Sequence, residues 1–436
     1  MMSGVGRHPS QHLAVCRDPD VQVMAMSKPS IATGMVAAVP KIGPKPDQAN
    51  PRIITQYRTE MRIGIDARLA TQLGGTGVST YGGALADTVR AIGHEVEPLV
   101  EGSRGSRMRV WRDALRPGAW PTHRTDNGRI AGDVFRAAQV HFDLSGRLRQ
   151  LHAPNDPPAL MHWTYPLPLH MRDVPNLYTV HDLIPLLYPE LTLVPRRRMT
   201  RLLHRVTAAA AEIITVSEAS RQEIITVLGV SPARVTNTYQ AVLDPRPSPT
   251  MIDQVLQPLG LQRGNYVLHA GTVERRKNVG RLVAAHRASR TRLPLVIAGP
   301  DGWCAREELA GAGLELRRIP WLERQSLTAL LAGARMVVVP SLAEGFGLPV
   351  AEAMTFGVPA ICSDRGALAE VAGGAARLVC PTNIAAMAAA IAELSTNDAA
   401  AETLVAAGHH RATLFTRDAY AARLRPLYAR LAQSCL

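Results

Sequence analysis

Cysteine, aromatic residues and long apolar runs are all scarce in this 436-residue sequence. The five cysteines are scattered, odd in number and include no Cys-x-x-Cys pair, so neither a disulfide framework nor a zinc site is expected. No apolar run approaches the roughly 20 residues that cross a bilayer, so no transmembrane helix is expected. These absences exclude a disulfide-stapled secreted domain and predict a cytoplasmic protein whose cysteines are free.

The remaining composition is that of a globular protein with a basic surface. Hydrophobic residues make up 46% of the sequence and charged residues 19%, and the length allows two or three domains with separate cores. The aromatic content of 4% favours helices of Ala, Leu and Val packed over strands. The net charge is +13, and much of the excess lies in arginine-rich pieces of the first half. These pieces are Arg104 to Arg116, Arg147, Arg149, Arg196 to Arg198, Arg201 and Arg205.

Such a surface suits an anionic membrane, a nucleic acid or a phosphorylated small molecule. Aromatic residues do not alternate with the arginines, as they do where proteins stack bases, so no nucleic-acid partner is expected. We interpret the arginines as a peripheral contact with the inner face of the plasma membrane. The alternative is a proteome that favours arginine, with no surface role for these residues.

Residues 1–60 are expected to lie outside the fold. The segment Val39–Pro51 is too rich in proline for a strand or helix, and the preceding residues have no sustained period. The segment also lacks the basic start, apolar centre and small-residue exit of a signal peptide. It is either a disordered extension or the result of a start codon placed too early, with Met61 as the working one. Asp18-Pro-Asp20 matches a metal-binding D-x-D pattern but has no strand before it, so we discount it.

Short apolar runs alternate with helical segments from residue 62 onwards. This alternation is typical of doubly wound parallel sheets, so the predicted fold class is α/β with two Rossmann-like domains. In the first half the predicted strands are 62–66, 95–100, 140–144, 159–163, 176–180 and 212–216, with a helix over 79–92 and another starting at Ser217 and Glu218. In the second half they are 266–270, 295–298, 316–320, 336–339, 359–362 and 377–379. The predicted boundaries are an N-terminal domain at 61–245, a proline-rich linker at 246–262, a C-terminal domain at 263–416 and a final helix at 417–436.

One stretch, Pro340–Met354, combines the features of an anion site. It follows the β-branched run 336–339 and places Gly345 and Gly347 before Pro349, which suits the first turn of a helix. A strand, a glycine loop and a helix N-terminus together bind phosphate through free amides and the positive helix end. Glu344 and Glu352 bracket the loop and can bind hydroxyl groups. Alternatively, a glutamate in a first helical turn merely stabilises the helix.

Two further strings place polar groups directly after strands. Within Val267–Asn278 a strand is expected to end at Gly271. The loop after it supplies Arg276 and Lys277, whose positive charges can neutralise a leaving diphosphate. Asn278 is expected to cap the helix that follows. Thr179–Pro185 places His181 and Asp182 at the edge of an α/β sheet where ligands bind. The alternatives are that Arg276 and Lys277 belong to an exposed charged loop without a ligand and that His181 has only a structural role. Weaker glycine signals occur at Gly75 and Gly77, before the first helix, and at Gly299.

Taken together, these strings resemble the retaining glycosyltransferases of family 4, which have the GT-B fold. Glu-Gly-Phe-Gly-Leu-Pro-x-x-Glu-Ala-Met matches their E-x7-E signature, and Gly-Thr-Val-Glu-Arg-Arg-Lys-Asn and Val-His-Asp-Leu-Ile-Pro match two further motifs. Ser79 departs from the family, since many relatives carry a glycine there. The resemblance spans roughly residues 61–432. It implies two Rossmann-like domains that face a central cleft, the first (61–245) on the acceptor side and the second (263–416) binding the nucleotide sugar. It also implies a C-terminal helix that crosses back to the first domain.

The resemblance also implies the roles of individual residues. Glu352 would hold the ribose hydroxyls, Glu344 would face the donor sugar, and His181 would lie beside the transferred sugar, with Asp182 orienting its ring or capping a turn. The amides of Phe346, Gly347 and Leu348 would take diphosphate oxygens beside Gly345, with Arg276 and Lys277 replacing a metal. Gly299 would lie near the nucleoside, and Gly75 and Gly77 near the donor phosphate.

The expected activity is metal-independent, cofactor-free transfer of mannose from GDP-mannose to a lipid-linked glycan of O-antigen or exopolysaccharide assembly. Two other enzyme types share the fold or donor chemistry: a transferase that uses a UDP-sugar (a glucosyl- or N-acetylhexosaminyltransferase), and a GT-B epimerase or phosphorylase. The epimerases lack the Glu344–Glu352 string, and no cofactor lysine of a phosphorylase is identifiable. A non-catalytic basic protein that binds membrane or nucleic acid is the last alternative, and its binding would not depend on Lys277 or Glu352.

Overall fold

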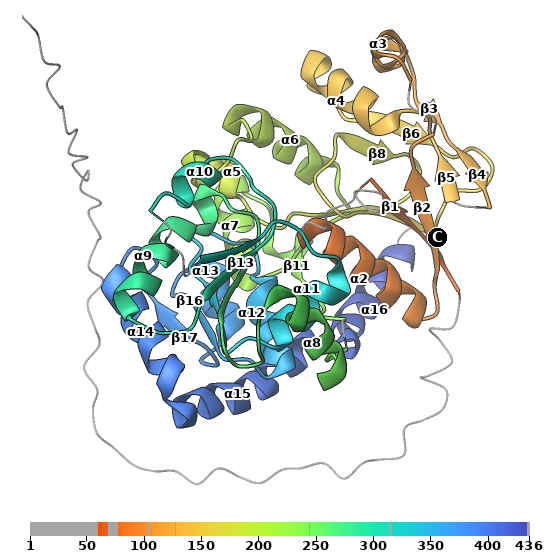
Figure 1. Ribbon diagram of the computed structural model, residues 1–436. Helices are drawn as coiled ribbons and strands as arrows, with labels where there is room; N and C mark the ends of the chain where they lie inside the picture. Colours follow the sequence, from red (N-terminus) through yellow and green to blue (C-terminus); the bar gives the residue numbers. More distant parts are fainter. Residues whose placement is uncertain are drawn as a thin grey trace, which may run out of the picture. The chain divides into compact units, whose positions relative to one another are not determined.

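The computed structural model describes residues 60–68, 77–102, 105–126, 128–243, 245–311, 313 and 316–433 (Figure 1). The predicted extension, up to residue 59, and Gly75 lie outside these residues. None of the described helices is both long and apolar enough to span a membrane.

The N-terminal half contains an eight-stranded sheet in the order β11-β10-β9-β7-β1-β2-β5-β4. Only the β4–β5 pair is antiparallel. Every residue of the inner strands β7, β9 and β10 is buried, as in a parallel sheet covered on both faces. The strands are β1 (Arg62–Asp66), β2 (Glu95–Val100), β4 (His123–Thr125), β5 (Gly128–Ile130), β7 (Leu160–Trp163), β9 (Asn176–Thr179), β10 (Glu212–Thr215) and β11 (Val235–Asn237). A smaller sheet contains β3 (Trp120–Pro121), β6 (Arg149–His152) and β8 (Leu169–Met171).

The helices of this half are α2 (Gly77–Ala91), α3 (Arg107–Leu115), α4 (Val134–Ser145), α5 (Ile184–Leu187), α6 (Arg196–Ala209) and α7 (Glu218–Leu228). The strand predicted at 140–144 is wrong, because these residues belong to α4. Val134, Ala138 and Phe142 recur every four residues on the buried face of that helix, so burial follows a helical period. Gly146 caps the C-terminal end of α4 in a left-handed backbone conformation that suits glycine.

The C-terminal half is built on a six-stranded, fully parallel sheet in the order β14-β13-β12-β15-β16-β17. Its strands are β12 (Val267–Ala270), β13 (Leu295–Ala298), β14 (Leu316–Ile319), β15 (Met336–Val339), β16 (Ala360–Ser363) and β17 (Arg377–Val379). The order reverses between β12 and β15, and such a switch point opens a ligand crevice at the carboxyl ends of the strands. Both predicted phosphate motifs follow these two strands.

The helices of this half are α8 (Pro249–Leu256), α9 (Val279–Ser289), α10 (Ala305–Glu308), α11 (Arg324–Ala332), α12 (Leu348–Phe356), α13 (Gly366–Ala372), α14 (Ile384–Thr396) and α15 (Asp398–Ala412). Helix α8 lies inside the range predicted as a linker, 246–262. Ser248 caps it by accepting a hydrogen bond from the Met251 amide at 3.2 Å, and Ile252 and Leu256 are buried. Because α8 also packs against α11, this range is part of the core and not an open connection.

The last helix, α16 (Arg417–Gln433), returns to the N-terminal half and packs against α2 (Figure 1). The Tyr428 hydroxyl lies 2.7 Å from Nδ1 of His162 on β7, and Arg430 donates to Glu212 on β10 at 3.0 Å. The crossing predicted for this helix is confirmed.

Candidate active site

The loop between β15 and α12 contains the two glycines of the strongest motif, and each has a steric reason to be glycine. Gly347 precedes α12 with φ +104°, a conformation that other residues rarely adopt, and a side chain there would overlap Leu368. A side chain at Gly345 would overlap the carbonyl oxygen of His181. The Ser220 hydroxyl, on α7, lies 2.9 Å from that oxygen and 3.4 Å from the Gly345 carbonyl oxygen. Gly345 therefore lets the two halves meet backbone to backbone.

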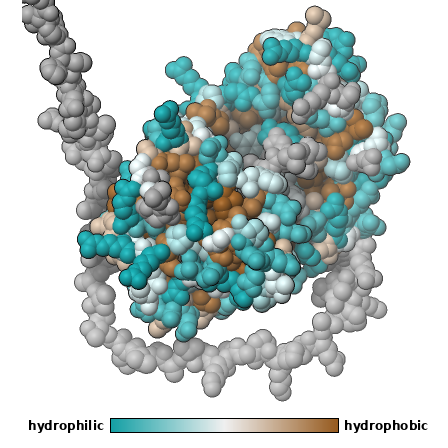
Figure 2. Space-filling view, viewed as in Figure 1, coloured by the Kyte–Doolittle hydropathy of each residue, from teal (hydrophilic) through white to brown (hydrophobic). Residues whose placement is uncertain are grey.

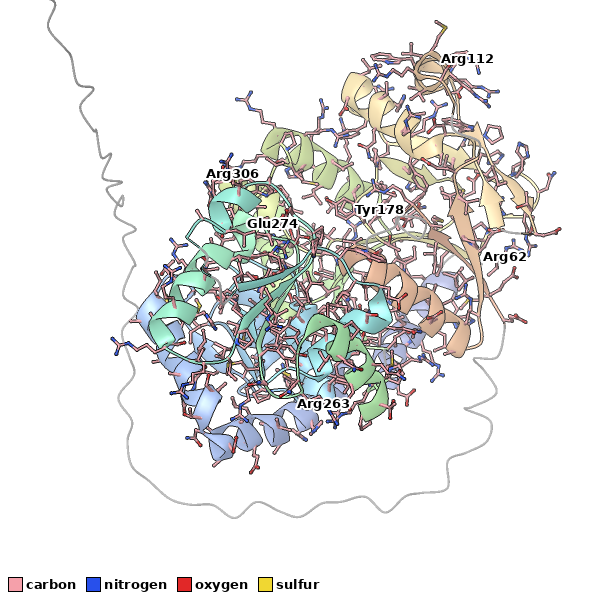
Figure 3. All side chains as sticks on the ribbon, in the orientation of Figure 1. Arg62, Arg112, Tyr178, Arg263, Glu274 and Arg306 are labelled. Carbon is pink, nitrogen blue, oxygen red and sulfur yellow. The ribbon has the colours of Figure 1, made fainter. Side chains whose placement is uncertain are left out.

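Glu344, next to this contact, is clamped by two cations from the β12–α9 loop. Arg276 donates to one carboxylate oxygen at 2.7 Å and Lys277 to the other at 2.5 Å. Burial alone would raise the pKa of Glu344, but Arg276 and Lys277 outweigh it and lower that pKa to about 2. Arg276 also pairs with Glu274 at 2.7 Å, and Figure 3 labels Glu274 on this loop. The structure therefore brings together three of the predicted catalytic residues.

Further hydrogen bonds fix the β12–α9 loop against the β15–α12 loop. The Leu342 amide donates to the Arg276 carbonyl at 2.8 Å. The Asn278 side-chain amide donates to the carbonyls of Pro340 at 2.9 Å and Pro381 at 2.7 Å. Asn278 is the N-cap residue of α9, as expected, but its side chain forms no cap bond. Its amide instead ties this loop to Pro340 and to Pro381, which follows β17.

Glu352 lies in a different environment from Glu344. It is the fifth residue of α12 and therefore in its second turn, so the expected first-turn position is wrong. The alternative of a glutamate that merely stabilises the helix N-terminus fails for the same reason, because no acidic residue stands in the first turn. Glu352 is 3% exposed and forms an ion pair with Arg324, the first residue of α11.

His181 and Asp182 lie directly after β9, as predicted, but their side chains have different partners. His181 Nε2 lies 2.9 Å from the Thr164 carbonyl oxygen, and its ring meets Tyr81 edge-on at 4.8 Å between centroids. Burial lowers the pKa of His181, so the imidazole is held neutral near pH 7. Asp182 Oδ1 accepts from the Ile184 amide at 3.0 Å, so of its two expected roles the structure shows the turn cap.

The weaker glycine signals have structural settings too. Gly299 follows β13 with φ +142°, and a side chain there would overlap the carbonyl of Gly271, which follows β12. Gly77 is the first residue of α2, and a side chain at that position would meet no neighbour within 4 Å.

A cavity of about 600 Å³ lies between α2 and β1 of one half and the β14–α11 segment of the other. Asp66, Trp321 and Arg324 line it, together with Leu348 at the start of α12. Burial raises the pKa of Asp66 to about 7, against the lowering effect of its hydrogen bonds to Thr164. The sequence motifs did not identify Asp66, Trp321 or Arg324 as site residues. Asp66 ends the first strand at the ligand edge of its sheet, which was a usable signal, whereas Arg324 gave none.

Among the described residues, no group of three or more His, Cys, Asp or Glu side chains could hold a metal ion.

A mostly parallel sheet and a fully parallel sheet meet here, and their strand ends present cations, carboxylates and a helix N-terminus, an arrangement of α/β proteins that is suited to a phosphorylated ligand. The family model described as "Glycosyltransferase Family 4" matches residues 75–242. The family model described as "Glycosyl transferases group 1" matches residues 253–411. The chain belongs to the family 4 glycosyltransferases and has the GT-B fold, as the motifs predicted.

The curated relatives include several mannosyltransferases. The chain is 35% identical over 251 residues to the O-antigen chain mannosyltransferase B of Escherichia coli, an alignment that covers 55% of this chain and 66% of that protein. It is 31% identical over 238 residues to the MMP alpha-(1->4)-mannosyltransferase of Mycolicibacterium hassiacum, covering 51% and 55%. The alignments thus span about half to two thirds of these relatives.

Solved structures share the fold at low sequence identity. Sucrose-phosphate synthase from Thermosynechococcus elongatus superposes with a TM-score of 0.62 at 20% identity, covering 86% of this chain and all of that one. WaaG, a glycosyltransferase involved in lipopolysaccharide biosynthesis, superposes with a TM-score of 0.57 at 17% identity, covering 85% and 99%.

Proposed function

We propose that this protein is a retaining glycosyltransferase that moves mannose from GDP-mannose onto a lipid-linked oligosaccharide or polysaccharide precursor. The observation that carries the proposal is the clamp of Arg276 and Lys277 on Glu344 at the switch point of the C-terminal sheet, in contact with the His181 segment of the other half. The family supports transfer of a glycosyl group, and the names of the curated relatives support mannose.

The donor diphosphate would bind at the start of α12. The amides of Gly347 and Leu348 are among the first N–H groups of α12, which have no intrahelical partners, and the amide of Phe346 precedes them directly. The helix dipole favours an anion there. Arg276 and Lys277 would share their charge between Glu344 and the phosphate oxygens. As the bond from the anomeric carbon to the phosphate oxygen breaks, negative charge grows on the phosphate, and these cations stabilise it most at the transition state.

Lys277 has a further peculiarity in this sequence. It is the single lysine after residue 45, although lysine and arginine together number 49. A lysine differs from an arginine as a compact, rotatable point charge. A chain that uses arginine almost everywhere else thus places the one lysine after residue 45 on Glu344.

Glu352 would bind the ribose hydroxyls of the nucleoside, with Arg324 holding its carboxylate in place. Glu344 would accept hydrogen bonds from hydroxyls of the transferred sugar, and neutral His181 would contact the same sugar from the other half. The acceptor hydroxyl would attack the anomeric carbon on the face from which the phosphate leaves, and its proton would pass to the departing phosphate. That route retains the anomeric configuration and needs neither a metal nor a cofactor.

The experiment is a donor screen on the full chain with membrane extracts as acceptor source, in the presence of EDTA. We expect release of GDP from GDP-mannose above the release of UDP from UDP-sugars. Lys277→Ala and Glu352→Ala should each lower kcat/KM by about 100-fold or more, with unchanged far-UV circular dichroism. Glu402→Gln, an exposed glutamate on α15, serves as the control. Full activity in both site variants would refute the site, a preference for UDP-sugars would refute the donor, and loss of activity with EDTA would refute metal independence.

The isolated lysine allows a second, independent test. An amine-directed reagent followed by peptide mass spectrometry should modify Lys277 more slowly when GDP is bound, because the diphosphate would cover its ammonium group. Lys28, Lys41 and Lys45 of the same chain are internal references whose labelling should not respond to GDP. Equal labelling of Lys277 with and without GDP would contradict its contact with the diphosphate.

A further inference from the structure

Helix α3 is held to the N-terminal half by one face only. Val110 and Ala114, four residues apart, are buried against α4. The Ala114 carbonyl oxygen lies 2.9 Å from Nδ1 of His141 on α4, and Ser106 caps the helix by accepting from the Arg109 amide. In Figure 1, α3 lies at the outer end of this half, beyond α4. The helix is thus fixed in place while its other faces point to solvent.

The exposed side of α3 contains a stripe of large apolar side chains. Met108, Trp111 and Leu115 recur every three or four residues and are 82%, 51% and 66% exposed. Three of the ten large exposed apolar side chains among the described residues thus fall on one nine-residue helix. Exposing them costs free energy that a partner would recover, so a stripe of this kind marks a contact surface.

Arginines lie on both sides of this stripe. Arg107, Arg109, Arg112 and Arg116 are all exposed, and Asp113 is the only acidic residue between 105 and 118, which leaves a net charge of about +3 on this segment. Figure 3 labels Arg112 on α3, and Figure 2 shows hydrophilic and apolar atoms side by side at the place of this helix. By contrast, three arginines of α6 are bound to α4 and the turn after it: Arg198 donates to Asp143, Arg205 donates to the Gly146 carbonyl, and Arg201 lies over the Phe142 ring.

We propose that α3 docks this protein on an anionic lipid bilayer, with Met108, Trp111 and Leu115 in the interface and the arginines on lipid phosphates. A short amphipathic helix with apolar anchors, a tryptophan and flanking cations is the chemistry that lies flat in a headgroup layer. The inference extends the proposed function, because a lipid-linked acceptor would lie at the same surface.

A protein partner fits the same surface less well. A helix of nine residues is about 14 Å long, too short to supply the roughly 800 Å² per partner that a stable protein interface buries. A bilayer imposes no such limit, since it adapts to a small patch and gains from every cation near its phosphates.

The test measures co-sedimentation of the full chain with vesicles of phosphatidylcholine alone or mixed with phosphatidylglycerol. Wild type should bind the mixed vesicles and lose binding as salt rises. Met108→Ser/Trp111→Ser/Leu115→Ser and Arg107→Gln/Arg112→Gln should each weaken binding by at least about tenfold. The matched controls, Val227→Ser on α7 and Arg306→Gln/Arg425→Gln at two exposed arginines, should bind as wild type.

A spectroscopic readout covers the case in which the triple variant fails to fold. Brominated lipid should quench tryptophan emission in wild type, and the conservative Trp111→Phe should remove that quenching while keeping vesicle binding. Unchanged binding by both α3 variants, absence of quenching through Trp111, or equal binding to pure phosphatidylcholine would overturn the proposal. Release of GDP from GDP-mannose without acceptor should not change in the α3 variants. Vesicle binding through α3 by a chain that releases no nucleoside diphosphate would refute the proposed function and uphold this inference.

Discussion

Glu344 shows how much one side chain depends on its neighbours in this site. A buried carboxylate with no partner would prefer to be neutral, yet two cations within 2.7 Å hold this one ionised. The arrangement works in both directions, because Glu344 also offsets the repulsion between adjacent Arg276 and Lys277. A diphosphate entering the site would therefore meet cations that are already held in place, which lowers the cost of ordering them.

We expect Glu344→Gln to destabilise the fold in a pH-dependent way. The folded-state pKa of about 2 lies below the ordinary value of 4.5, so this carboxylate contributes stability above pH 4.5 that is lost as the pH falls towards 2. The difference in unfolding free energy between wild type and the variant should be constant from pH 5 upwards and shrink towards pH 2. Urea titrations at several pH values measure it. A difference that does not change with pH would show that Glu344 is not ionised in the fold.

At the scale of elements, the N-terminus of α7 connects the two halves. The Glu218 and Ala219 amides, at the start of α7, donate to the two carboxylate oxygens of Glu370 on α13, each at 2.7 Å. The predicted start of α7 at Ser217 and Glu218 is confirmed, and Ser217 caps it by accepting from the Ser220 amide. The sequence could show that start, because capping is local, but not that a carboxylate 151 residues away would complete it.

Replacing that carboxylate tests the connection. Glu370→Gln removes a negative charge from a helix N-terminus and should lower the free energy of unfolding by about 1 kcal/mol. If the contact also holds the halves together over the donor, the KM for GDP-mannose should rise while kcat changes little. Glu402→Gln on α15, exposed and away from α7, should leave stability and KM unchanged. Equal stability of Glu370→Gln and wild type would show that the carboxylate contributes nothing.

Across the whole molecule, α16 ties the end of the chain to the sheet at its beginning. Tyr428 and His162 are 266 residues apart in sequence, and the ring of His162 also lies 2.9 Å from the Thr179 hydroxyl, which in turn lies 2.9 Å from Tyr81. Tyr81 touches His181. A buried network therefore runs from the last helix to the candidate site, and removing one member leaves a buried polar atom unpaired.

Tyr428→Phe should lower the free energy of unfolding by about 1–3 kcal/mol, because His162 Nδ1 would lose its partner in a dry environment. Burial already lowers the pKa of His162 to about 3, so protonation cannot replace the lost bond near pH 7. Thermal and urea unfolding measure the effect, with Tyr188→Phe, 42% exposed, as the matched control. Equal losses in the two variants would contradict a role for the hydroxyl.

The sequence by itself determined the elements and the motifs at their ends. Buried parallel strands consist of short β-branched runs, as at 336–339, and loops with positive φ need glycine, as at Gly347. Both are signals that a few neighbouring residues carry. The predictions that differ from the structure also concern short stretches of sequence. The run at 140–144 is apolar enough for a strand but is buried with a helical period, and the proline-rich range 246–262 contains a capped helix.

Only the tertiary structure decided which charges meet. Lys277 and Glu344 are 67 residues apart, Arg324 and Glu352 are 28 apart, and the contact of Gly345 with His181 joins the two halves. No periodicity or spacing encodes these pairs, because they follow from the order of β12 and β15 in one sheet and from the docking of one half on the other. The physical reason is that propensity and pattern act over a few residues, whereas ion pairing in a dry site depends on where distant loops are brought together.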